Sequence, residues 1–141
     1  MKNYNDIAAI RITDKEKSAN DIMGIYWNNA LENTGVTWYS TDVSIKQEPT
    51  KVIFFHNTQN SKFYYMADIL EIRSFENEEI ITEKEIPEVY KDVPKKTWIR
   101  ISNIKKMDEA DLKKYYAVKD NELLFDKVNK KIFNLAYFYQ K

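Results

Sequence analysis

Residues 37–41 bring aromatic rings and hydroxyl groups together in one short stretch, Thr-Trp-Tyr-Ser-Thr. An aromatic ring stacks on a nucleobase with a gain of about 1–3 kcal/mol, and a captured base also needs hydrogen bonds at its edge. We therefore predict a base pocket here, in which Trp38 is favoured over Tyr39 as the stacking ring. The alternative is that both rings are core residues. Because the stretch shows no clear strand or helix pattern, we interpret it as a loop.

Two other residues have the chemistry for catalysis or binding. His56 is the single histidine, so a site with several histidine ligands is excluded, and no Ser/His/Asp arrangement can be identified. We interpret it as a solvated turn residue, with donation to a base edge or phosphate as the alternative. Asp68 is the odd acid in an apolar strand and would be the general base of an enzyme. It could equally point outward or pair with Arg100, so no catalytic residue is assigned.

The charge changes sign between two neighbouring segments. Residues 76–92 hold seven acids and two lysines, whereas residues 95–106 hold five basic residues and no acid. The acidic run matches no EF-hand spacing, and we interpret it as a solvated loop rather than a metal site or a nucleic-acid mimic. The basic segment is the candidate for contacts to phosphates, with solvated charge as the equal alternative. The predicted backbone contacts are Lys95, Lys96, Arg100, Lys105, Lys106 and, from the hairpin loop, Lys62.

Length and composition restrict the class of protein. A chain of 141 residues is expected to form one domain. It has no cysteine, which excludes disulfides, thiolate metal sites and a cysteine nucleophile. Its two glycines, Gly24 and Gly35, are too few for a phosphate-binding loop of the GxGxxG type. We expect no cofactor. A net charge of zero argues against avid sequence-independent binding to phosphates, although a locally basic face remains compatible with it.

Hydropathy gives a further expectation about location. The polar start MKNYND is not followed by a signal-peptide core, and no apolar run approaches the roughly 20 residues of a membrane helix. We therefore expect a cytoplasmic protein without a membrane partner.

Periodicity predicts the elements that would position these residues. Strands are expected at 7–13, 52–56, 63–72 and 97–104, with the second and third forming a hairpin. Helices are expected at 21–31 with Asp21 as N-cap, after Asp108, and at 123–139, where apolar residues recur at helical spacing. Several strands with interspersed helices predict an α+β fold, a small curved and partly closed β-barrel flanked by helices. Residues 1–141 would form this domain, with the helix 123–139 packed on it.

Three pieces of the sequence resemble the PUA-like superfamily, and within it the YTH and EVE domains. Residues 37–41 are similar to the Trp-x-Ser-Thr loop that follows the first helix of YTH domains. The hairpin VIFFHN…FYYMADILEI resembles the paired central strands of these domains, and KTWIRI resembles a later strand. The resemblance covers about residues 7–121. It implies a barrel-like sheet and a pocket for modified bases, N6-methyladenine in RNA for YTH and modified DNA bases for EVE-like modules.

The resemblance also implies roles for individual residues. Trp38 would be the first wall of the aromatic cage, with Ser40 and Thr41 near the edge of the base. Thr13 would lie close to the pocket. From its place in the first helix, and not from the resemblance, we expect Trp27 to pack in the core or to line the same cleft. YTH domains supply a second tryptophan after the hairpin, where this sequence offers Phe75.

The leading hypothesis is therefore a non-catalytic nucleic-acid-binding module that flips and captures one base, methylated or unmodified, from DNA or RNA. The resemblance places such a module in prokaryotic restriction or defence systems. One alternative is a small enzyme acting on a nucleotide or nucleoside, similar to the ASCH group. The other is a protein-interaction module that uses the acidic segment.

Overall fold

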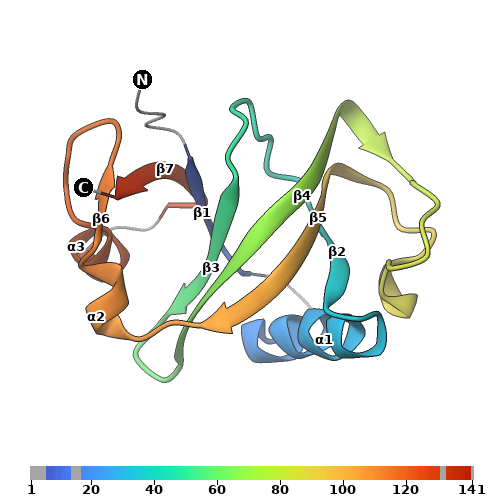
Figure 1. Cartoon of the computed structure of the whole chain (residues 1–141), viewed down its shortest axis with the longest axis horizontal. Coiled ribbons are helices and arrows are strands. Elements are labelled where there is room, and N and C mark those ends of the chain that lie inside the picture. The colour runs from blue at the N-terminus through green and yellow to red at the C-terminus, as the bar shows by residue number, and fades with distance from the viewer. Residues whose placement is uncertain (1–5, 14–16, 131–132, 141) are drawn as a thin grey trace.

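A seven-stranded mixed sheet in the order β2-β5-β4-β3-β1-β7-β6 forms the centre of the molecule (Figure 1). The computed structural model describes residues 6–13, 17–130 and 133–140. Within these ranges the sheet is not closed, and β1 and β3 are its one parallel pair. The strands are β1 Ile7–Arg11, β2 Val36–Thr41, β3 Lys51–Asn57, β4 Lys62–Glu79, β5 Lys95–Lys106, β6 Tyr115–Ala117 and β7 Leu135–Gln140. The helices are α1 Ala19–Glu32, α2 Glu109–Leu112 and α3 Leu124–Lys130, with a 3-10 turn, η1, at Glu88–Tyr90.

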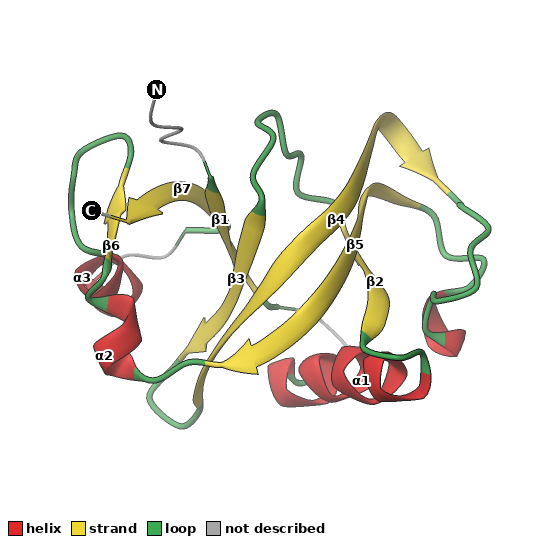
Figure 2. Cartoon of the chain, viewed as in Figure 1, coloured by secondary structure: helices red, strands yellow, loops and turns green. Residues whose placement is uncertain are grey.

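The helices lie in two separate places along the sheet. Figure 2 shows α1 beside the β2 end of the sheet and α2 with α3 beside the β6 end. Each group covers its own hydrophobic cluster: Tyr26 of α1 and Tyr90 of η1 belong to the first, Leu112 of α2 and Val128 of α3 to the second. The predicted α+β fold flanked by helices is confirmed, without closure of the barrel.

The central strands separate the two clusters by the alternation of their side chains. In β3, Val52 and Phe54 belong to the first cluster, whereas Ile53 and Phe55 belong to the second. Successive side chains of a strand point to opposite faces, so a strand covered on both faces needs apolar residues at every position. This explains the nearly continuous apolar run of β3, and the predicted hairpin of this strand with β4 is confirmed.

The helix starts follow local capping chemistry. The predicted cap at Asp108 is confirmed, because its side chain accepts from the backbone N–H of Asp111 and Asp111 accepts in return. For α1 the prediction of Asp21 as the N-cap is wrong. Ser18 is the cap and its hydroxyl accepts from the backbone N–H of Asp21, so the helix begins two residues earlier than expected. Gly35 has a φ of 88° at the turn after α1, as expected for a turn glycine.

Two predicted elements are wrong. Residues 36–41 are not a loop but the edge strand β2, which pairs with β5. The predicted helix 123–139 ends at Lys130, and residues 135–140 form strand β7 between β1 and β6. The sequence Leu-Ala-Tyr-Phe-Tyr-Gln is rich in residues that favour strands, and pairing on both sides outweighs the helical spacing of its apolar residues. The predicted helical position Ile132 lies outside the described residues.

The long hairpin strand continues beyond its predicted end. β4 runs to Glu79, through the first part of the acidic segment, with register shifts against β5 along its length. Residues 80–94 connect β4 to β5 through η1. This connection, yellow in Figure 1, lies at the same end of the molecule as α1.

Candidate functional site

A cavity of about 390 Å³ lies where the end of β1, helix α1, strand β2 and the turn η1 come together. Its volume falls within the roughly 300–1,000 Å³ of typical small-molecule sites. The tyrosine rings come from α1, β2 and η1, while polar and charged residues come from the ends of β1 and β2 with the loops after them, from the start of β5 and from the residue before β7. The lining residues are Arg11, Ile12, Thr13, Ile22, Tyr26, Tyr39, Ser40, Thr41, Asp42, Val43, Tyr90, Lys95 and Asn134.

Three tyrosines form the aromatic part of the wall. Tyr26 and Tyr90 are stacked with an interplanar angle of 7° and ring centroids 5.3 Å apart. Tyr39 is tilted against Tyr26 at 5.0 Å and rests on Phe54 of the core at 4.6 Å. All three rings are largely buried, so their positions are fixed by packing. The wall is therefore a rigid set of rings.

Burial also controls the ionisation of these tyrosines. It raises the pKa of Tyr26 well above the ordinary value, and the neighbouring Tyr90 and Tyr39 add to this effect. It likewise raises the pKa of Tyr39, against the smaller opposite effect of a hydrogen bond to Thr41. Both rings consequently keep their phenolic protons at neutral pH. The Tyr26 hydroxyl accepts from the backbone N–H of Ser40 at 3.3 Å.

Cationic and polar groups line the more exposed part of the cavity. The Arg11 guanidinium donates to the side-chain oxygen of Asn134 through Nε at 3.3 Å and Nη2 at 2.9 Å, so its orientation is fixed. Lys95 Nζ lies 3.8 Å from Asp42, the one carboxylate among the described lining residues. Thr13 is exposed here. The cavity thus joins a ring wall to two cations, a combination that suits a flat aromatic group carrying a negative charge.

The structure brings five of the predicted site residues together. Tyr39, Ser40, Thr41 and Thr13 line the cavity, as does Lys95 from the predicted backbone-contact set. The sequence did not show that residues at the ends of β1 and β2 would line the same cavity. Their strands are separated by β5, β4 and β3 in the sheet, and α1 joins them across one face.

Trp38 is placed differently from its predicted role. Its exposed fraction is 0%, it does not line the cavity, and the guanidinium of Arg73 lies 4.8 Å from its ring centroid. In this structure the indole therefore cannot stack on a base. The reason is the strand character of residues 36–41, which gives Trp38 and Tyr39 different environments. Tyr39, the less favoured ring, lines the cavity.

Trp27 and Phe75 also lie outside the cavity. Trp27 is 38% exposed on α1 and its ring packs 5.8 Å from Tyr65. Phe75 is partly buried against the first hydrophobic cluster. The aromatic ring from the β4–β5 connection is instead Tyr90. It is the one aromatic residue of the acidic stretch 76–94, a signal in the sequence that we missed.

The predicted basic residues of β5 are spread along the strand and have different neighbours. Lys95 and Lys105 stand ten residues apart on β5, which corresponds to about 30 Å along a strand. Lys105 and Lys106 line a separate cavity together with Lys51. Arg100 is bound to Glu85, with Nε and Oε1 3.0 Å apart. Lys96 and Lys62 do not line the ring-walled cavity.

The other candidates for chemistry lie apart from the cavity. Asp68 pairs with Lys51 at 3.3 Å and accepts from Asn103 at 3.2 Å, so its partner is not Arg100. His56 packs against Phe63. Among the described residues, no group of three or more histidine, aspartate or glutamate side chains could hold a metal ion. None of the described helices is long and apolar enough to cross a membrane.

The structure thus combines an α+β sheet with a ring-walled cavity at the β2 end. The chain belongs to the Pua-like family, whose model matches residues 22–141. This confirms the resemblance to the PUA-like superfamily, whose domains generally bind RNA or other nucleic acids and are typically binding modules rather than enzymes. No curated protein and no solved structure matches the chain.

Proposed function

We propose that this domain is a non-catalytic nucleic-acid reader that captures a single base in the cavity between α1, β2 and η1. The observation that carries the proposal is the cavity itself, which combines rigid tyrosine rings with hydroxyl groups and two cations. Stacking on an aromatic ring contributes about 1–3 kcal/mol per base, and the hydroxyls offer bonds to its edge. The proposal thus moves the stacking role from Trp38 to Tyr39 and Tyr90.

The cations suit the phosphate that accompanies a captured base. Arg11 is held by two hydrogen bonds to Asn134, and among the described residues no other side chain bonds its remaining N–H groups, which can reach a ligand. Lys95 is the second cation, and its partner Asp42 is 3.8 Å away and 50% exposed, so the ion pair is expected to be weak. Contacts to phosphates position a strand without reading its sequence. Arg11 and Lys95 would therefore orient the nucleotide while the rings hold its base.

The finer identity of the base follows from the resemblance to YTH and EVE domains. A methyl group buried against the rings adds about 0.8 kcal/mol, equivalent to roughly a fourfold preference. A prokaryotic restriction or defence setting enters the proposal through that resemblance alone. The enzymatic alternative has less support, because Asp68 is paired with Lys51 away from the cavity.

A binding titration with short single strands tests the proposal. RNA and DNA strands carrying one adenine, one N6-methyladenine or one abasic site in an otherwise identical sequence are compared at fixed salt. We expect the strand with a base to bind more tightly than the abasic strand, and the methylated base to bind best. Equal affinity for the abasic strand would contradict base capture.

A further inference from the structure

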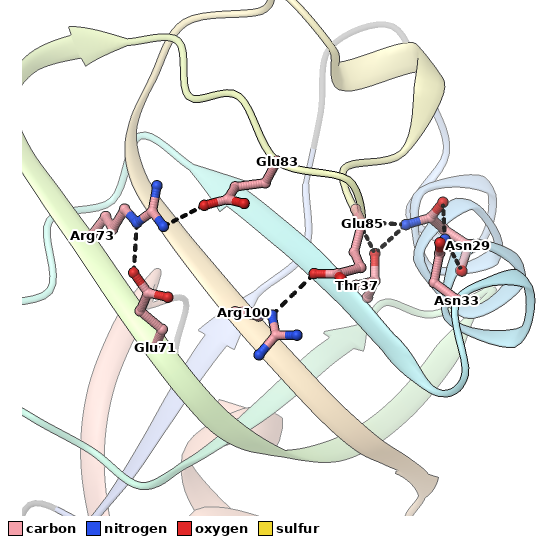
Figure 3. A network of polar contacts seen from close by, with 8 residues as sticks. All are labelled: Asn29, Asn33, Thr37, Glu71, Arg73, Glu83, Glu85 and Arg100. Atoms are coloured by element: carbon pink, nitrogen blue, oxygen red, sulfur yellow. Dashed lines mark hydrogen bonds and ion pairs between the residues drawn. The ribbon is translucent and has the colours of Figure 1, made fainter.

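The β4–β5 connection, residues 80–94, supplies the Tyr90 ring to the cavity, and Glu85 is one of the points at which it is anchored. The backbone carbonyl of Glu85 accepts from Asn29 Nδ2 at 2.7 Å, from the backbone N–H of Trp38 at 3.2 Å and from Thr37 Oγ1 at 3.5 Å. Figure 3 shows the side chains of Asn29 from α1 and Thr37 from β2 converging on Glu85. One residue of the connection is thus tied to both elements that form the cavity.

Two arginines hold the same stretch from the face of the sheet (Figure 3). Glu83 accepts from Arg73 of β4 at 2.5 Å, and Glu85 accepts from Arg100 of β5 at 3.0 Å. The intervening Lys84 is exposed. Glu83 and Glu85 thus face the sheet while Lys84 faces away, the alternation that an extended chain produces. The side chains of both pairs are no more than about one-third exposed, with values from 22% to 34%, and such pairs are screened less by salt than surface ones.

The segment that joins Glu85 to the cavity residue Tyr90 is short, and packing restrains it. Ile86 follows Glu85 directly and is 3% exposed, and Pro87 is buried and is the N-cap of η1. Tyr90 ends η1 and stacks on Tyr26. A displacement of the chain at Glu85 is therefore transmitted to the Tyr90 ring within five residues.

We propose that Glu83 and Glu85 are positioning residues for the cavity, because their pairs with Arg73 and Arg100 keep Tyr90 stacked on Tyr26. The acids do not line the cavity and act on it through the chain that they hold. The consequence for base binding rests on the proposed function, whereas the effect on Tyr90 does not. Glu83 and Glu85, which we expected to be solvated, thereby gain a structural role. The same holds for Arg100, which we expected to contact phosphate.

The first measurement needs no ligand. In NMR spectra, the ring current of Tyr26 changes the chemical shifts of the Tyr90 ring protons, so these shifts report whether the two rings are stacked. We expect Glu85→Arg, which places two cations opposite each other, to move these shifts toward those of an unstacked tyrosine. The exchange Glu85→Arg with Arg100→Glu should restore them. The matched control is Glu88→Arg, since Glu88 is highly exposed and pairs with Lys91 on the same connection.

The second measurement titrates the same variants with the methylated single strand. Glu85→Arg is expected to bind about tenfold more weakly, or about 1.4 kcal/mol, and the exchange variant to recover to within about threefold. Unchanged Tyr90 shifts in Glu85→Arg, or equal changes in Glu88→Arg, would overturn the inference. If the wild-type protein binds no strand, the proposed function fails, and the Tyr90 shifts still decide the inference.

Discussion

The roles of Trp38 and Tyr39 show how a single residue step changes the function of an aromatic ring. Neighbouring residues of a strand point to opposite faces, and the register of β2 against β5 pairs Trp38 with Arg100 and Tyr39 with Ile99. The sequence showed that aromatic and hydroxyl groups occur together in residues 37–41. Which of the two rings lines the cavity depends on which face of β2 is covered by other residues. The guanidinium of Arg73, 35 residues away in the chain, lies over the Trp38 ring.

Trp38 is expected to contribute to stability and not directly to binding. Trp38→Phe leaves a void in the first hydrophobic cluster and weakens the stacking on Arg73, and should lower the free energy of unfolding by about 1–3 kcal/mol. Urea denaturation measures this loss, and a titration of the folded protein measures affinity. A large loss of affinity with unchanged stability would instead support the originally predicted stacking role.

Thr13 tests whether the cavity hydroxyls contact the ligand. Thr13→Val keeps the shape of the side chain and removes the hydroxyl, so affinity for the methylated strand should fall by about 3- to 10-fold, corresponding to one lost hydrogen bond. Isothermal calorimetry gives the affinity. The control is Thr82→Val, at an exposed threonine of the β4–β5 connection outside the cavity. Equal losses in both variants would argue against a direct contact.

At the scale of elements, several features that depend on residues close in the chain can be recognised in the sequence. The cap at Asp108, the turn at Gly35 and the hairpin of β3 and β4 all follow from residues close in the chain. The edge strand β2 does not, because its pairing with β5 joins residues about 60 positions apart. The stacking of Tyr90 on Tyr26 is equally remote in sequence, so only the assembled sheet shows it.

Helix α1 offers a test of an element that holds the cavity. Ser18→Ala removes the oxygen that accepts from the backbone N–H of Asp21 and should lower the stability by about 1 kcal/mol. Asp21→Ala removes only the favourable charge in the first turn and should cost less. Thermal and urea denaturation measure both. A larger loss for Asp21→Ala would indicate that the predicted cap is the correct one.

At the scale of the whole molecule, the C-terminal segment shows why periodicity alone misleads. Residues 123–139 carry apolar groups at helical spacing, yet β7 alternates Leu135 and Tyr137 toward the first cluster with Ala136 and Phe138 toward the second. Because the sheet has a core on each face, an inner strand can be apolar at most positions. Such a run fits either periodicity until the second core is known.

The burial of Phe138 distinguishes strand β7 from the helix predicted over residues 123–139. The helical pattern buries Tyr139 and leaves Phe138 outside, whereas Phe138 in β7 is completely buried. Phe138→Ala should lower the free energy of unfolding by about 3–5 kcal/mol, and Tyr139→Ala by clearly less. Urea denaturation of both variants gives the comparison. A greater loss for Tyr139→Ala would contradict the strand.

The central claim, a base held by the tyrosine wall, is tested most directly at Tyr90. We predict that Tyr90→Ala weakens binding of the single strand carrying N6-methyladenine by about 5- to 150-fold, the range that corresponds to one lost stacking contact. Val89→Ala, at a 54% exposed position of the same turn, should bind as the wild type does. A folded Tyr90→Ala variant with wild-type affinity would contradict the account.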